Sequence, residues 1–101
     1  MDQNDAIRMS RAFLEKIRQT NMVVLDVWLF GSYAKGTYNE DSDIDLAIVL
    51  SDSLLSFDTD VRLMTLRKGE ETMIETHTYS KEDFQSDTPM MAQIKKYGFR
   101  L

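Results

Sequence analysis

Residues 30–50 read Phe-Gly-Ser-Tyr-Ala-Lys-Gly-Thr-Tyr-Asn-Glu-Asp-Ser-Asp-Ile-Asp-Leu-Ala-Ile-Val-Leu. The pair Gly31-Ser32 follows an apolar run, and ten residues later Asp43 and Asp45 open a second one. Small residues at a strand-to-helix turn offer backbone N–H groups and a hydroxyl to phosphate oxygens. Paired carboxylates bind hard divalent cations. The stretch therefore predicts a phosphate cradle beside a divalent-metal clamp.

The pattern on either side of this stretch predicts alternating helices and strands. Apolar periodicity, turn residues and capping residues indicate the following elements in chain order: an amphipathic helix over 3–20, a strand over 23–30, a helical turn over 33–35, a strand over 43–50, a helix near 57–67, a strand over 72–79, a short helix capped by Ser80, and a helix from Pro89 to Tyr97. This order predicts an α/β or α+β domain with a small sheet flanked by helices.

Side-chain alternation orients the second strand. Asp43 and Asp45 share one face with Ala47, whereas Ile44 and Leu46 pack the other way. In the helix near 57–67, the apolar side chains fall on one side: Phe57, Val61 and Met64.

Composition bounds the class of protein. With 101 residues the chain is expected to form one domain over residues 1–101. No apolar run approaches the roughly 20 residues that span a bilayer, and no signal peptide is recognisable, so no membrane association is expected. The absence of cysteine excludes disulfides and thiolate metal sites and favours a cytoplasmic protein.

The net charge of −5 limits the partners. An acidic surface repels a phosphate backbone, which makes nucleic acid an unfavourable partner. A polyanionic substrate must then be bound at a local site where cations cancel its charge.

Three carboxylates are the candidate metal ligands. Asp45 lies in an otherwise apolar run, where an unpaired carboxylate is costly to bury and a cation removes that cost. Glu75 lies mid-strand and is the candidate third ligand beside Asp43 and Asp45; as an alternative it is a surface residue of an edge strand. Glu71, nearer the start of that strand, is the competing candidate.

The remaining polar and aromatic candidates each have two interpretations. Lys35 either neutralises a triphosphate or only decorates the turn. His77, the only histidine, shares a face with Glu75 and is either catalytic or structural. Tyr33 and Tyr38 can stack on a base, but packing is the expected role.

The spacing of Gly31-Ser32 and Asp43-Ile44-Asp45, together with the flanking Leu29-Phe30 and Leu46-Ala47, resembles the signature of the DNA polymerase β-like nucleotidyltransferase superfamily. More narrowly, residues 28–50 look like the minimal nucleotidyltransferases (MNT proteins) of prokaryotes. The resemblance implies a polymerase β-like fold with a small mixed sheet, two Mg²⁺ ions as cofactors, and ATP as substrate. By the same resemblance, Asp43, Asp45 and Glu75 are catalytic metal ligands. Gly31, Ser32 and Lys35 are expected to bind the nucleotide.

Members of that group are commonly encoded beside helical HEPN proteins, as toxin–antitoxin pairs. The resemblance therefore implies an antitoxin that transfers AMP from ATP to a tyrosine of a HEPN-type toxin, in a homo- or hetero-oligomer. One alternative is nucleotide transfer to a small molecule, which usually needs a second domain. Another is an antitoxin that acts by binding alone, which the intact carboxylates argue against.

Overall fold

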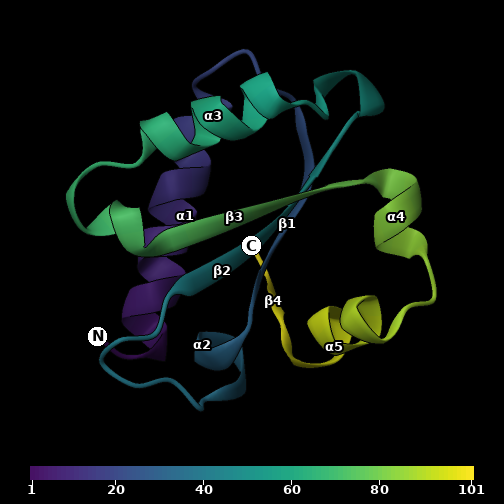
Figure 1. Cartoon of the computed structure of the whole chain (residues 1–101). Coiled ribbons are helices and arrows are strands. Elements are labelled where there is room, and N and C mark those ends of the chain that lie inside the picture. The colour runs from purple at the N-terminus through teal and green to yellow at the C-terminus, as the bar shows by residue number, and fades with distance from the viewer.

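The computed structural model describes all residues 1–101 and contains a four-stranded sheet in the order β3-β2-β1-β4 (Figure 1). Its elements, in chain order, are α1 (Gln3–Arg18), β1 (Val24–Phe30), α2 (Ser32–Lys35), β2 (Ile44–Leu50), the 3₁₀ turn η1 (Asp52–Leu54), α3 (Phe57–Leu66), the 3₁₀ turn η2 (Gly69–Met73), β3 (Ile74–Ser80), α4 (Lys81–Gln85), α5 (Pro89–Tyr97) and β4 (Phe99–Arg100). The predicted α/β class is confirmed.

The sheet is mixed. Strand β1 pairs antiparallel with β2 and with β4, whereas β2 pairs in parallel with β3. The register places Asp45 between Phe30 on β1 and Glu75 on β3. One residue of β2 therefore adjoins both the end of β1 and the start of β3.

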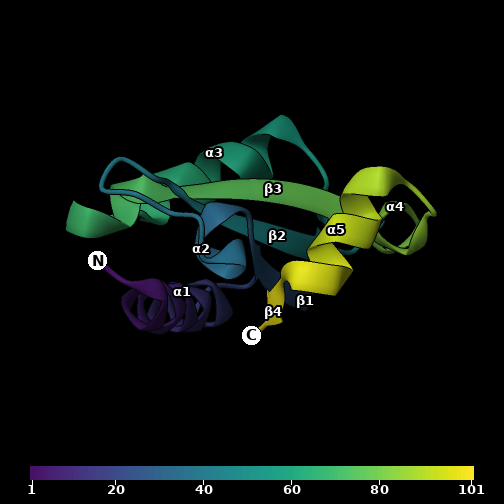
Figure 2. The same ribbon diagram turned by 90° about the horizontal axis from the view of Figure 1, so that it is seen from below.

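The larger core lies between one face of the sheet and helix α1. The side chain of Asp2 caps α1 by accepting a hydrogen bond from the Asp5 amide, and Asp5 returns one to the amide of Asp2. The inner stripe of α1 packs against alternate residues of β2, all fully or almost fully buried: Ala6, Phe13, Leu14, Ile17, Ile44, Leu46, Ile48 and Leu50. Figure 2 shows α1 as a separate layer beside the strands.

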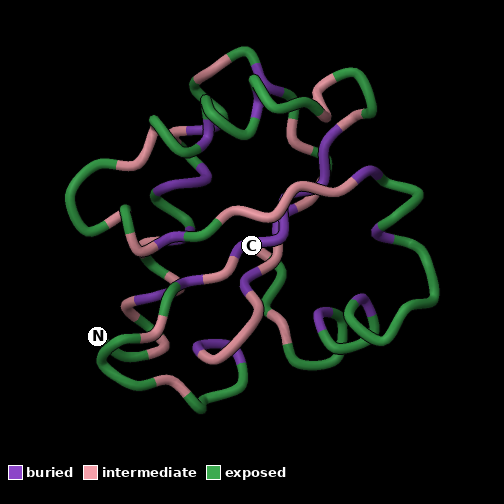
Figure 3. Tube along the Cα trace, in the orientation of Figure 1, coloured by how far each residue is buried: buried purple, intermediate pink, exposed green.

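A smaller core lies on the opposite face. Ala47 and Val49 of β2 pack there against Phe84 of α4 and against Met91 and Ile94 of α5. Ser80 caps the short helix α4 as predicted, because its side chain accepts a hydrogen bond from the Asp83 amide. The buried segments of Figure 3 run along the middle strands and the inner sides of the helices.

Helix α3 turns its apolar side outward. Phe57 is 79% exposed, and Val61 and Met64 are also exposed, whereas Thr59 and Leu63 are buried. The three apolar residues share one side as the sequence indicates, but the helix is anchored by its other side. The interior is already filled by α1, so α3 inserts only Leu63 fully into that core. No helix of the protein has the length and apolar character that crossing a membrane requires.

Strand β4 was not predicted. It is two residues long and pairs Arg100 with Trp28 and Phe99 with Leu29. The chain reaches β1 through Gly98, where an added Cβ would overlap the carbonyl oxygen of Ile94 and lie 2.9 Å from that of Leu29. Only a residue without a side chain permits so close an approach.

We expect Gly98→Ala to lower the free energy of unfolding by about 1–3 kcal/mol, because overpacking against two carbonyls forces α5 or β4 to move. Urea denaturation followed by circular dichroism measures the change. The matched control is Gly36→Ala, where a Cβ meets nothing within 4 Å and only the left-handed backbone (φ 78°) is unfavourable. A Gly98→Ala protein as stable as the parent would refute this packing.

Candidate active site

The turn after β1 is shaped by Gly31. Its φ of 80° and ψ of −154° belong to a region that residues with side chains avoid. A Cβ built on Gly31 would also overlap the Asp45 carboxylate. The glycine thus meets two requirements, a backbone conformation and the space that Asp45 occupies.

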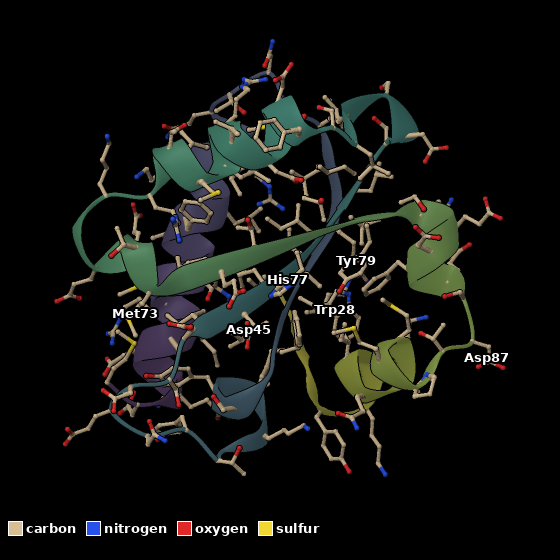
Figure 4. All side chains as sticks on the ribbon, viewed as in Figure 1. Trp28, Asp45, Met73, His77, Tyr79 and Asp87 are labelled. Carbon is tan, nitrogen blue, oxygen red and sulfur yellow. The ribbon has the colours of Figure 1, made fainter.

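Three side chains gather on the sheet beside this turn. Asp45 of β2 and Glu75 and His77 of β3 each offer a ligand atom within 4.8 Å of the others. Nε2 of His77 lies 3.2 Å from Oδ1 of Asp45, and Figure 4 shows these two side chains close together on the sheet. Glu75 is exposed, whereas Asp45 and His77 are partly buried, with side chains 24% and 30% accessible.

The imidazole of His77 is held by its neighbours. The hydrogen bond with Asp45 raises the pKa of His77, burial opposes that rise, and the charges of Asp45 and Glu75 add to it. The Phe30 ring packs edge-on against the imidazole, with centroids 5.2 Å apart. Because Phe30 precedes Gly31, the histidine and the glycine turn are positioned together.

Asp43 lies apart from this group. It is exposed, and strand β2 begins one residue after it, at Ile44 rather than at the predicted residue 43. The preceding loop is closed by a hydrogen bond from the Asn39 amide to the Ser42 hydroxyl. Asp43 is not one of the three clustered donors.

Glu71, the competing third carboxylate, is bound elsewhere. Its Oε1 accepts hydrogen bonds from Nζ of Lys16 at 2.6 Å and from the Lys68 amide at 2.9 Å. Burial opposes ionisation of Glu71, but these two bonds prevail and lower its pKa below the usual value. Of the two candidates, only Glu75 lies in the cluster with Asp45.

Gly31 and Lys35 line a cavity of about 160 Å³ between α2 and α5. The Lys35 ammonium lies 3.0 Å from Oε1 of Gln93 and 5.6 Å from the centroid of the Tyr97 ring. Gln93 was missed at the sequence level, because only the packing of α5 brings it near the glycine turn. Ser32 is the first residue of α2, follows Gly31 directly in the chain and is partly exposed.

Tyr33 and Tyr38 have the packing role that was expected. Their rings stack with centroids 4.7 Å apart, and Tyr33 is almost fully buried. Burial raises the pKa of the Tyr33 hydroxyl. The side-chain amide of Gln3 donates to the Tyr33 carbonyl at 2.8 Å and so ties α1 to the turn that carries Gly31.

A glycine turn packed against a strand carboxylate, with further donors on the next strand, is the arrangement that the sequence signature predicts for nucleotidyltransferases. A family model described as a nucleotidyltransferase domain matches residues 10–95, and the chain belongs to this family. The resemblance inferred from residues 28–50 is thereby confirmed.

Particular relatives are also similar. The chain is 29% identical over 82 residues to the protein adenylyltransferase MntA of Shewanella oneidensis, a match that covers 68% of this chain. The chain spans about half (54%) of the length of that curated relative.

Solved structures share the fold. A putative nucleotidyltransferase from Sulfolobus solfataricus superposes with a TM-score of 0.63 at 16% identity, covering 97% of this chain and 80% of that one. A toxin–antitoxin complex with AMP-PNP gives 0.62 at 22% identity, covering 99% and 72%. A mutant of the toxin–antitoxin MntA-HpeT gives 0.54 at 21% identity with the same coverage.

We expect Glu71→Gln to destabilise the protein by about 1 kcal/mol at neutral pH, because Lys16 loses its charged partner. The lowered pKa of Glu71 means that its contribution is present above the unfolded-state pKa and is lost as the pH falls through the folded-state pKa. The deficit relative to the parent should therefore shrink on acidification below about pH 4.5. Urea denaturation between pH 3 and 7 measures it. A deficit that is constant with pH would contradict the Lys16–Glu71 pairing.

Proposed function

We propose that this protein transfers AMP from ATP to a tyrosine hydroxyl of a HEPN-type toxin and thereby acts as its antitoxin in the cytoplasm. The observation that carries the proposal is the packing of Gly31 against the Asp45 carboxylate. In this proposal Gly31 belongs to a turn that binds phosphate and Asp45 binds a metal ion, two tasks that phosphoryl transfer needs side by side. Residues 1–101 act in this proposal as one nucleotidyltransferase domain.

The donor atoms fit a divalent cation. Carboxylate oxygens of Asp45 and Glu75 are ligands that Mg²⁺ prefers, and the site is open enough to leave coordination positions for phosphate oxygens. In the proposed site Asp45 and Glu75 would hold one ion, and the exposed Asp43 would be a ligand of a second. Bound Mg²⁺ supplies charge neutralisation at the phosphates and activation of the acceptor hydroxyl.

The chain's own residues then have separate roles. The backbone N–H groups at Gly31 and the Ser32 hydroxyl bind the terminal phosphates, and Lys35 adds a positive charge from the rim of the cavity. The cavity behind them is smaller than the roughly 300–1,000 Å³ of sites for drug-sized ligands. It can accept one part of a nucleotide and not the whole molecule.

The protein's charge supports a protein acceptor. At a net charge of −5 there is little attraction for a polynucleotide backbone, whereas a protein acceptor needs only a complementary patch. Exposed Met90, Tyr97 and Phe99 offer apolar surface for such a patch, and Met90 and Tyr97 also line the cavity. The relative MntA is named a protein adenylyltransferase, which supports the same acceptor class.

The test is an acceptor assay with α-labelled ATP and Mg²⁺, in which the protein is offered its co-encoded partner, tRNA and DNA. We expect label on the partner protein at tyrosine, which mass spectrometry locates, and none on either nucleic acid. Labelled RNA ends with an unlabelled partner would overturn the proposal in favour of polymerase-like transfer. Partner neutralisation without any label would favour an antitoxin that acts by binding alone.

We further expect Asp45→Asn and Glu75→Gln to reduce the rate of this transfer by at least about a hundredfold, because each removes a charged ligand next to the phosphate turn. Asp43→Asn should also abolish transfer if the second ion binds as proposed. Glu71→Gln is the matched control, since it removes a carboxylate that Lys16 binds, and its rate should stay near that of the parent. A large loss of transfer rate in Glu71→Gln, together with a near-parent rate in Glu75→Gln, would instead identify Glu71 as the metal ligand.

A further inference from the structure

His77 offers a possible metal-ligand atom that the proposed function leaves unused. It is the only histidine of the chain, and it lies on the open part of the sheet face, next to Asp45 and Glu75. A histidine whose only task was packing could be buried in the smaller core, yet His77 keeps 30% of its side chain accessible. Its Nε2 points to the Asp45 carboxylate.

The distance between the Asp45 and His77 donor atoms suits two neighbouring ligands of one metal ion. Two ligands at neighbouring corners of an octahedron lie about 3.0 Å apart when each is about 2.1 Å from the metal. Nε2 of His77 and Oδ1 of Asp45 are 3.2 Å apart, and the Glu75 oxygen completes a group that spans no more than 4.8 Å. One cation can therefore contact all three with small side-chain movements.

The ligand type selects the metal. Mg²⁺ takes oxygen ligands almost exclusively, whereas an imidazole nitrogen favours first-row transition metals. Two carboxylates and one imidazole, with the other positions open, form a set that binds such metals through three protein ligands. The edge-on contact with Phe30 holds the imidazole in place, so little ordering is needed when the metal binds.

We propose that His77 coordinates a divalent transition metal directly, together with Asp45 and Glu75, and that the site therefore binds Mn²⁺ in preference to Mg²⁺. The inference rests on the proposed function, because it concerns the same site, but it changes the identity of the metal. Asp43, which lies outside the cluster, is then not needed for this ion.

The test uses Mn²⁺ as the probe on the untagged full chain, with and without a non-hydrolysable ATP analogue. Electron spin-echo spectroscopy of bound Mn²⁺ detects coupling to a directly bound ¹⁴N of imidazole. Because the chain holds one histidine, any imidazole coupling identifies His77. We expect this coupling in the parent and in Phe30→Leu, which keeps the imidazole, and its loss in His77→Gln.

Titration calorimetry supplies the second readout. We expect His77→Gln to weaken Mn²⁺ binding by about tenfold and Mg²⁺ binding by less than about twofold. Equal losses for both metals, or bound Mn²⁺ without imidazole coupling, would overturn the inference and leave His77 as a residue that orients Asp45 by hydrogen bonding. In that case transfer activity can persist, and the proposed function stands. Failure of the parent to bind either metal would overturn both proposals.

Discussion

The close approach of Gly31 to Asp45 is the constraint on which the site depends. Phe30 and Asp45 are cross-strand partners, so the turn that ends β1 passes directly over the start of β2. Only a residue without a side chain, and with access to positive φ, can make that turn without displacing the carboxylate. The strand pairing therefore holds the backbone of the glycine turn against the Asp45 carboxylate.

Parallel pairing of β2 with β3 supplies the rest of the donor set. It aligns Glu75 with Asp45 and places His77 two residues further along on the same face. Parallel strands need a crossover connection, and here it runs through α3. On the opposite face of the sheet, Leu63 of α3 joins the residues of α1 in the larger core. Helices α4 and α5 cover only the far end of the site face, which leaves the donors accessible to a substrate.

The local chemistry of the sequence predicted most of this arrangement. The alternation of Ile44, Asp45 and Leu46 indicated which side chains face the larger core, and Pro89 and Gly98 marked the limits of α5. What the sequence could not show depends on contacts between distant segments. Glu71 pairs with Lys16, which lies 55 positions earlier in the sequence, and no local pattern distinguishes Glu71 from Glu75.

Contacts between distant segments also explain the other features that the sequence did not predict. Strand β4 is too short to have a periodic signal, and it forms because Gly98 allows the chain to approach β1. Gln93 reaches Lys35 only through the packing of α5. The outward-facing apolar side of α3 has the periodicity of a core helix, since spacing alone does not reveal which side is covered.

A crystal structure of the protein with a non-hydrolysable ATP analogue and a divalent cation tests the central claim most directly. The account predicts the terminal phosphates against the Gly31 and Ser32 backbone, and a cation that bridges them to Asp45 and Glu75. A nucleotide bound elsewhere on the protein, or a cation that contacts neither Asp45 nor Glu75, would contradict it.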